Sequence, residues 1–354
     1  MSTWLLESKV RPPTPWVNES QSMTSSDERQ PKSRRGLFWL VAFIVVLFAV
    51  YSGGWFYLAN RVRAEADKAV ATLNKSGINA GCANLQVSGY PLSFTVSCDN
   101  LAYEDDAKNI AASAGSFNAV AQIIQPLSPV ADLRGPLRTS VPGMVPLWID
   151  WDNLQAKVKL SWPLPQRVAL QAEGLSGQTD PADDTDPVEL FSAGRAAGQL
   201  QPNGQDVDYV GSFTDLEIDP DAIGGRVLPA LDASGDATLK NGVALIGTQV
   251  KSLRGQKVEI RNLDLSSGTA RVTVSGPLSV DTEGLVDADL MIRIKDPKAV
   301  ASILSGAIPE QKNAIEQGFA ALAMLGSEPS MPLKVVKGKA SLGFIPLGKI
   351  KPVQ

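Results

Sequence analysis

The apolar residues of this chain fall into two patterns, one unbroken run near the N-terminus and a long region of alternation after it. Residues 37–59, LFWLVAFIVVLFAVYSGGWFYLA, contain no charged side chain. Crossing a hydrocarbon core of about 30 Å takes roughly 20 apolar helical residues. The apolar region of a cleaved signal peptide is shorter, about 7–15 residues. We therefore predict an uncleaved transmembrane helix over residues 37–59.

The basic residues on either side of this run set its expected orientation. Four lysines and arginines lie within residues 29–35 and three within residues 61–68. Because such residues are favoured on the cytoplasmic side, the small excess predicts a cytoplasmic N-terminus. Residues 1–36 are then a disordered cytoplasmic lead that begins at Met1 or at Met23.

Residues 60–77 are predicted to continue the membrane helix as a stem. Val62, Ala66 and Val70 recur on one helical face, and Gly77 suits the position just after a helix end. A plain amphipathic stem is favoured over a helix that binds a partner.

From residue 78 onward the dominant period is two, which is typical of strands with one buried face. The densest alternation lies in residues 269–294, TARVTVSGPLSVDTEGLVDADLMIRI, where hairpin signals recur about every ten residues. We predict a mainly β domain over residues 78–354, a long antiparallel meander that folds as a sandwich or leaves a groove-like sheet. Further strands are expected at residues 113–125, 148–162, 167–175, 188–202, 206–218, 233–246 and 255–265, with one or two more in 333–350.

A few short helices are expected to lie on this sheet. Asp296 and Pro297 provide an N-cap and a first helical residue. Residues 309–325 predict a second helix and residues 219–231 a short third one. Residues 125–137, QPLSPVADLRGPL, are predicted to be turn-rich because of their prolines and glycine.

The two cysteines, Cys82 and Cys98, flank a predicted hairpin, CANLQVSGYPLSFTVSC. If residues 89–91 form its loop, Ser88 pairs with Leu92 and Cys82 lies opposite Cys98, within disulfide reach. Each face of that register mixes polar and apolar residues, so a bulge that shifts it is the alternative. We predict a disulfide and hence an oxidising, periplasm-like compartment. Two buried thiols in a reducing compartment are the other interpretation.

Composition narrows the function classes. The chain has no histidine, which excludes histidine-based catalysis and histidine metal sites. With 33 Lys and Arg against 37 Asp and Glu, there is no support for nucleic-acid binding. The aspartates of residues 180–187 lack calcium-loop spacing, so no metal and no cofactor is expected. A carboxylate-pair hydrolase with Trp148 and Trp151 stacked on a sugar is the remaining enzymatic alternative, and we expect a protein that is not an enzyme.

Several stretches together resemble a known family. They are the single anchor, SGYPLSFTVSC, QPLSPVADLRGPL, WDNLQAKVKL and VKGKASLGFIPLGKIKP. Together they resemble the bacterial envelope family labelled domain of unknown function 2125, over most of the chain after about residue 37. That family implies no activity and no functional residues. More loosely, the plan of an anchor followed by a meander is similar to AsmA-like envelope proteins, which are linked to lipid transport.

Two functions fit these features. In the first, an inner-membrane protein with a periplasmic domain binds or transfers lipid, because alternating strands leave an apolar face for acyl chains. In the second, a structural or scaffold protein binds another envelope protein. The candidate groove residues are Leu278, Val280, Leu290, Ile292 and Ile294, for which ordinary core packing is the alternative.

Overall fold

The computed structural model describes residues 34–75, 77–181, 185–246, 253–343 and 345–353. The chain divides into two compact units, Met1–Tyr51 and Ser52–Gln354. Helix α1 (Arg34–Lys75) is continuous, so the predicted transmembrane helix and the predicted stem form one element. Among the described residues it is the one helix long and apolar enough to cross a membrane.

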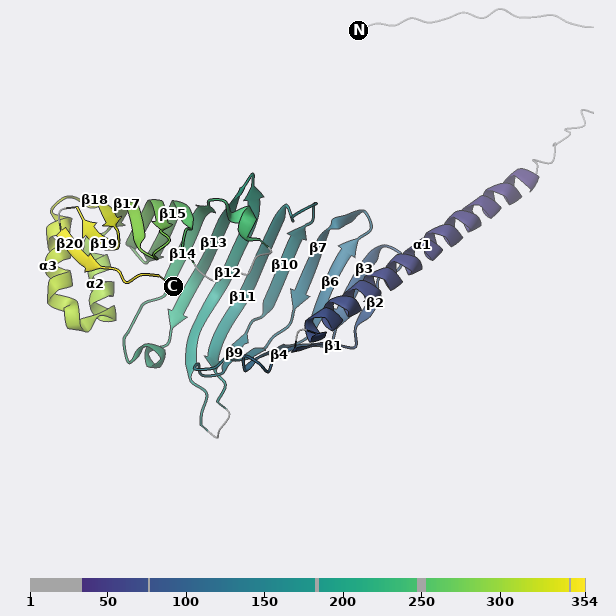
Figure 1. Cartoon of the computed structure of the whole chain (residues 1–354), viewed down its shortest axis with the longest axis horizontal. Helices are drawn as coiled ribbons and strands as arrows, with labels where there is room; N and C mark the ends of the chain where they lie inside the picture. The colour runs from purple at the N-terminus through teal and green to yellow at the C-terminus, as the bar shows by residue number, and fades with distance from the viewer. Residues whose placement is uncertain (1–33, 76, 182–184, 247–252, 344, 354) are drawn as a thin grey trace, which may run out of the picture. The chain divides into compact units, whose positions relative to one another are not determined.

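The rest of the described chain is mainly β, as predicted, and most of its strands form one long antiparallel sheet, here called the main sheet (Figure 1). Neighbouring strands pair in the order given below. The strands are β2 (Gln86–Ser88), β3 (Ser93–Cys98), β6 (Phe117–Gln122), β7 (Gln125–Leu133), β10 (Asn153–Lys159), β11 (Arg167–Thr179), β12 (Glu189–Asn203), β13 (Asp206–Ile218), β14 (Leu231–Leu239), β15 (Lys257–Ser267), β16 (Ala270–Val280), β17 (Val286–Lys295), β18 (Ser330–Val336), β19 (Lys339–Leu342) and β20 (Ile345–Lys349).

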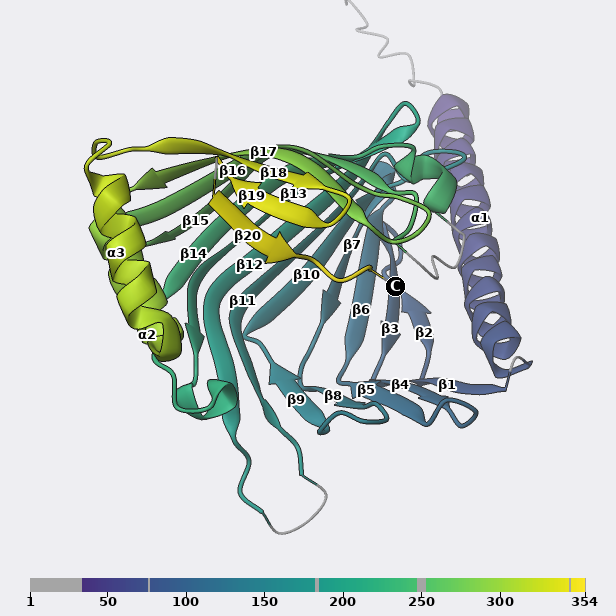
Figure 2. The same cartoon turned by 60° about the vertical axis from the view of Figure 1, so that its left-hand side comes forward.

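A smaller side sheet branches from the main sheet at β11 (Figure 2). Its strands pair in the order β1 (Ile78–Ala83), β4 (Asn100–Asp105), β5 (Ile110–Ala114), β8 (Leu137–Ser140) and β9 (Leu147–Asp150). The chain passes between the two sheets from β1 to β2, from β3 to β4, from β5 to β6, from β7 to β8 and from β9 to β10. Strands that switch sheets at a corner are typical of orthogonal sheet packing.

Two of the predicted strands cross this corner, and each of them is divided there into two shorter strands. Residues 113–125 divide at Gly115, whose backbone is so close to the carbonyls of residues 134 and 135 that no Cβ fits. Residues 148–162 divide at Trp151, which is buried and donates from Nε1 to the Leu133 carbonyl over 2.8 Å. In both places the alternation continues while the backbone turns.

The predicted disulfide between Cys82 and Cys98 is present, with the two Cα atoms 5.5 Å apart, but the predicted register is wrong. Ser88 pairs with Thr95, and Cys82 lies on β1 opposite Leu101. The polar–apolar mixture in the predicted register arose because two separate strands, β1 and β2, precede the loop. The disulfide thus joins the side sheet to the main sheet across the corner.

Three further expectations are corrected by the structure. The turn-rich prediction for residues 125–137 is wrong for β7, and the C-terminal stretch forms β18, β19 and β20 rather than one or two strands. The third helix is a single 3-10 turn, η1 (Pro220–Ile223), and another, η2 (Gly242–Leu245), follows β14. The N-cap prediction is confirmed: Asp296 accepts from the Ala299 amide at the start of α2 (Pro297–Ala307).

Two helices close one end of the main sheet. Helix α2 packs against β16 and β17, and α3 (Lys312–Ala323) follows it after the 3-10 turn η3 (Pro309–Gln311). The two helices lie side by side in Figure 2. Ala270, Ile294 and Val300 form the buried centre of the cluster beneath them, with Phe319 and Leu322 packed against it. This end of the sheet therefore has a conventional hydrophobic core.

At the other end, an aromatic cluster holds α1 against β3. The Trp55 ring stacks on Phe94 with centroids 5.3 Å apart, and its Nε1 donates to the Ser93 carbonyl over 3.1 Å. Tyr90 lies edge-on to Trp55 and stacks on Phe56. The last turns of the apolar run are therefore part of the folded β unit.

Candidate functional site

The main sheet has two chemically different faces. Because partners in an antiparallel pair lie on the same side, the registers place Ala172, Ala196, Phe213 and Ala233 on one face. The neighbouring residues, such as Glu173, point the other way. The first face, here called the inner face, is apolar across the sheet, and the outer face is polar.

Between β10 and β15 the inner face forms an open groove of about 760 Å³. Its side chains remain accessible: Leu170, Leu200 and Leu263 are 50, 46 and 43% exposed. Among the described residues that line it, none is charged. This volume lies within the range of about 300–1,000 Å³ that is usual for ligand sites, which are also lined mainly by apolar side chains.

Three glycines form the floor of the groove. Gly198, Gly211 and Gly235 are direct partners on β12, β13 and β14, between Leu170 on β11 and Leu263 on β15. A Cβ built on Gly235 would have the Leu263 side chain at 3.6 Å as its nearest neighbour, which is an ordinary van der Waals contact, so a small side chain would fit above that glycine. The glycines therefore create a shallow track that runs across the strands.

Tyr209 is the aromatic side chain that rests on this track. Its ring lies over Gly211 and comes within contact distance of a Cβ built on Gly198. The side chain is 45% exposed, and its register partners are Leu200 and Ala237. Tyr209 thus brings a hydroxyl group into a groove that is lined mainly by apolar residues.

The outer face behind the groove is held by a ladder of charges across β13, β14 and β15. Arg261 donates from Nη1 to Asp208 over 2.9 Å and from Nε to Asp236 over 2.9 Å. Thr238 donates to the same Asp208 oxygen over 2.6 Å. The Thr238 hydroxyl, followed by Arg261, lowers the pKa of Asp208 below its ordinary value. The ladder keeps the outer face polar and ties β13 and β14, which carry two of the three glycines, to β15.

This ladder predicts a pH dependence of stability. A carboxyl group with a lowered folded-state pKa stabilises the fold above its ordinary pKa, and this contribution is lost as pH falls through the folded value. We expect Asp208→Asn to reduce the free energy of unfolding at neutral pH by about 1 kcal/mol. The difference from wild type should shrink as the pH is lowered below the ordinary aspartate range.

Denaturant unfolding of the full chain in nanodiscs at several pH values measures this effect. Thr238→Val, which removes one donor to Asp208 at nearly constant volume, should change stability in the same direction. Equal unfolding midpoints for wild type and Asp208→Asn at neutral pH would contradict the prediction.

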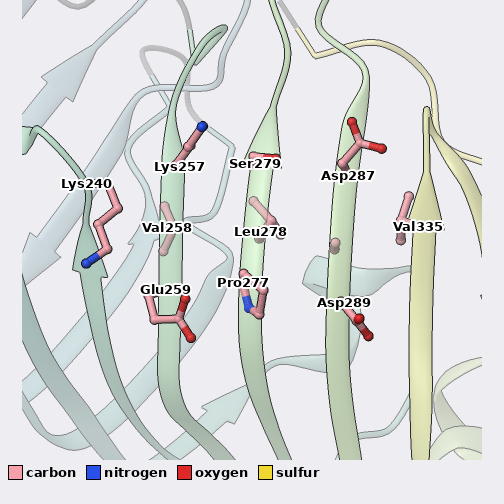
Figure 3. Close-up of a pocket in the computed structure, with 11 residues that line it drawn as sticks. Lys240, Lys257, Val258, Glu259, Pro277, Leu278, Ser279, Asp287, Asp289 and Val335 are labelled. Atoms are coloured by element: carbon pink, nitrogen blue, oxygen red, sulfur yellow. The ribbon is translucent and has the colours of Figure 1, made fainter.

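A second depression, of about 420 Å³, lies on the outer face over β15, β16 and β17 (Figure 3). Lys257, Ser279 and Asp287 are register neighbours there, and Glu259 and Asp289 lie one step along. β15 carries one charge of each sign and β17 carries two carboxylates, with no charge on β16 between them, as on a solvated sheet surface. Among the described residues, no three cysteine, aspartate or glutamate side chains are placed to hold a metal ion.

The five residues predicted to line a groove lie on the inner face, but not in its open part. Ile292 and Ile294 pack in the cluster beneath α2 and α3. Val280 and Leu290 are buried, and Leu278 lies behind the outer depression. Apart from Leu278, these residues are therefore interior, and the helices cover the part of β17 that carries Ile292 and Ile294.

The residues that do line the open groove are mostly small, and the sequence prediction missed them. In β14, alanine and glycine, among them Ala233 and Gly235, alternate with polar residues, and in β12 the inward positions 196 and 198 are also alanine and glycine. Small side chains at inward positions leave room above a sheet, whereas leucine and isoleucine fill it. That alternation of small residues is the signal that would have located the groove.

Comparisons with known proteins bear on the whole of this β unit. A comparison with curated proteins finds no match for the chain. The family described as "Uncharacterized protein conserved in bacteria (DUF2125)" matches residues 55–351, from the tryptophan that stacks on β3 to the residues after β20. The match contains both sheets, the disulfide and the groove, and the chain therefore belongs to this bacterial family.

Proposed function

We propose that this protein is a non-catalytic, membrane-anchored lipid-binding protein that holds an acyl chain in the inner-face groove. The observation that supports it best is the accessible apolar groove of about 760 Å³ with uncharged lining and a glycine floor. We place the β unit in the periplasm and the anchor in the inner membrane. The disulfide, which favours an oxidising compartment, supports this placement.

The length of the groove suits one acyl chain. Its lining extends over β10 to β15, and with strands about 4.8 Å apart this distance is roughly 24 Å. One leaflet of a bilayer is about 15 Å thick, half of the hydrocarbon core. A chain laid across the strands, past the Tyr209 ring that covers Gly211, is therefore shorter than the groove.

The energetics favour brief occupancy. Removing a methylene from water contributes about 0.8 kcal/mol, so a chain of about a dozen methylenes covered on one side gains roughly 5 kcal/mol. A bilayer covers the same chain on all sides. Lipid therefore enters the groove readily from water but remains there only briefly beside a membrane, as expected for transfer rather than storage.

Photocrosslinking captures such short-lived occupancy. The full chain is placed in nanodiscs of phosphatidylethanolamine and phosphatidylglycerol that include a phospholipid with a diazirine in its acyl chain, and adducts are mapped by mass spectrometry. We expect adducts on β11 to β14. The double variant Gly198→Val and Gly235→Val fills the track and should reduce them about tenfold, as a loss of about 1.4 kcal/mol in binding would.

The matched control places two valines on the outer face at positions that do not line the groove, Gln171→Val on β11 and Thr214→Val on β13, and should leave the adducts unchanged. A folded wild-type protein that forms no groove adducts would contradict lipid binding. That result would favour the alternative, a structural or scaffold protein of the envelope that binds another membrane protein.

A further inference from the structure

One edge of the main sheet carries exposed apolar side chains where the strands turn. Trp162, Ile124 and Leu92 are 95, 83 and 75% exposed, and Leu127 and Leu160 are also exposed. They lie in the β2–β3 loop, at the β6–β7 turn and the start of β7, and in the β10–β11 loop. Such a set of exposed apolar residues marks an interaction surface.

The three loops are neighbours in space. The Ile123 amide donates to the Leu92 carbonyl over 3.0 Å, and the Leu160 amide donates to the Leu127 carbonyl over 2.7 Å. These bonds place the loops side by side at one edge of the sheet. The exposed side chains therefore form one strip, here called the rim: residues 89–92, 123–127 and 160–164.

The rim is attached to the end of the apolar helix. Ser52 and Tyr90 are joined by a hydrogen bond between hydroxyl groups over 2.7 Å, and Trp55 bonds to Ser93 next to the first loop. Trp55 lies four residues before the end of the apolar run at residue 59, roughly 6 Å along the helix axis. If the apolar run crosses a bilayer, its end lies where the headgroups meet the acyl chains. The hydrogen bonds from Ser52 and Trp55 then hold the rim at this depth.

The charged residues around the rim also fit a position at the boundary between headgroups and acyl chains. Lys159 and Arg167 are register partners that flank the β10–β11 loop, and each basic residue near an anionic membrane surface contributes about 1 kcal/mol. The next loop along the same edge, residues 203–205, is polar. The opposite ends of the strands carry Asp99 and Asp150. Among the described residues of this edge, the most exposed apolar side chains thus lie in the loops nearest the helix.

We propose that the rim inserts into the outer part of the bilayer that holds α1, at the boundary between headgroups and acyl chains. Trp162 and Tyr90 suit this boundary, where aromatic side chains are enriched. The inner face continues without charge from Leu127 through Val158 and Val168 to the groove. With the rim inserted, the groove opens toward the membrane. The insertion of the rim does not depend on lipid binding in the groove.

Fluorescence quenching by spin-labelled lipid tests the insertion. Cysteine is introduced at Ile124 or Trp162, and at Asp186 in the acidic loop of the opposite edge as the matched control. All three positions are exposed, so the fold should tolerate the change. Each full-length variant is labelled with NBD without reduction of the native disulfide. It is then placed in nanodiscs of phosphatidylethanolamine and phosphatidylglycerol that include a lipid with a nitroxide high on its acyl chain.

We expect about a twofold loss of emission at residues 124 and 162 and none at residue 186, because apolar groups at this boundary lie about 5–10 Å deep. Equal emission with and without nitroxide at residues 124 and 162 would overturn the proposal. Quenching at the rim without lipid adducts in the groove would contradict only the lipid-binding function. Adducts without quenching would contradict only the rim.

Discussion

Replacing Trp55 with alanine is expected to destabilise the β unit by roughly 3–5 kcal/mol, the usual cost of removing a buried tryptophan. The side chain is 5% exposed, and its stack on Phe94 joins helix α1 to the main sheet. The variant also removes the donor to the Ser93 carbonyl. The loss should be local at first, with β2 and β3 opening before the strands further along the sheet.

Hydrogen exchange of the full chain in nanodiscs measures this effect, together with the thermal unfolding midpoint. We expect faster exchange in β2 and β3 and a lower midpoint for Trp55→Ala. Trp39→Ala is the matched control, because Trp39 belongs to the same helix but is 73% exposed. If the two variants exchange and unfold alike, the aromatic cluster does not hold the helix to the sheet.

The parts of the fold that local pattern determines were predictable from the sequence. Residues 206–218 were predicted as a strand and form β13 with the same bounds. The N-cap Asp296 was found because a capping residue followed by proline is a local signal. Both signals depend only on residues that are close in sequence, so they do not depend on how the rest of the chain folds.

The prolines of residues 125–137 led to a prediction of turns where the structure has β7, and the strand register explains why. Pro126 and Pro129 both lie in this strand, but its ladder with β6 and β10 uses residues 130–133 and Gln125. Neither proline occupies a paired position, so the missing amide costs no ladder hydrogen bond. Only the strand partners determine which amides are needed, and a single sequence does not reveal the partners.

The position of the groove was not predicted from the sequence, because a high density of large apolar residues indicates a buried strand face rather than an accessible one. The strongest alternation, which ends at Ile294, was chosen as the groove, and its residues Ile292 and Ile294 proved to be core beneath α2 and α3. The open part carries small residues such as Gly198 and Gly235, whose effect depends on their alignment across strands. The rim residues, Trp162 among them, were missed for the same reason, because only the topology brings their loops to one edge.

The side sheet depends on the disulfide, and Cys98→Ser is expected to lower the free energy of unfolding by about 3 kcal/mol. This is the chain-entropy value for a loop near 15 residues, and the two cysteines are 16 residues apart. Cys82 lies on β1 and Cys98 at the end of β3, so the variant loosens the corner between the sheets rather than one hairpin.

Denaturant unfolding of the full chain with and without a reductant measures this loss. Reductant should lower the midpoint of the wild type to that of Cys98→Ser and should leave the variant unchanged. Cys82→Ser should match Cys98→Ser, and the double variant should be no less stable than either, because all three lack the same bond. A wild-type midpoint that does not respond to reductant, with the disulfide verified as cleaved, would mean that packing across the corner holds the two sheets together without it.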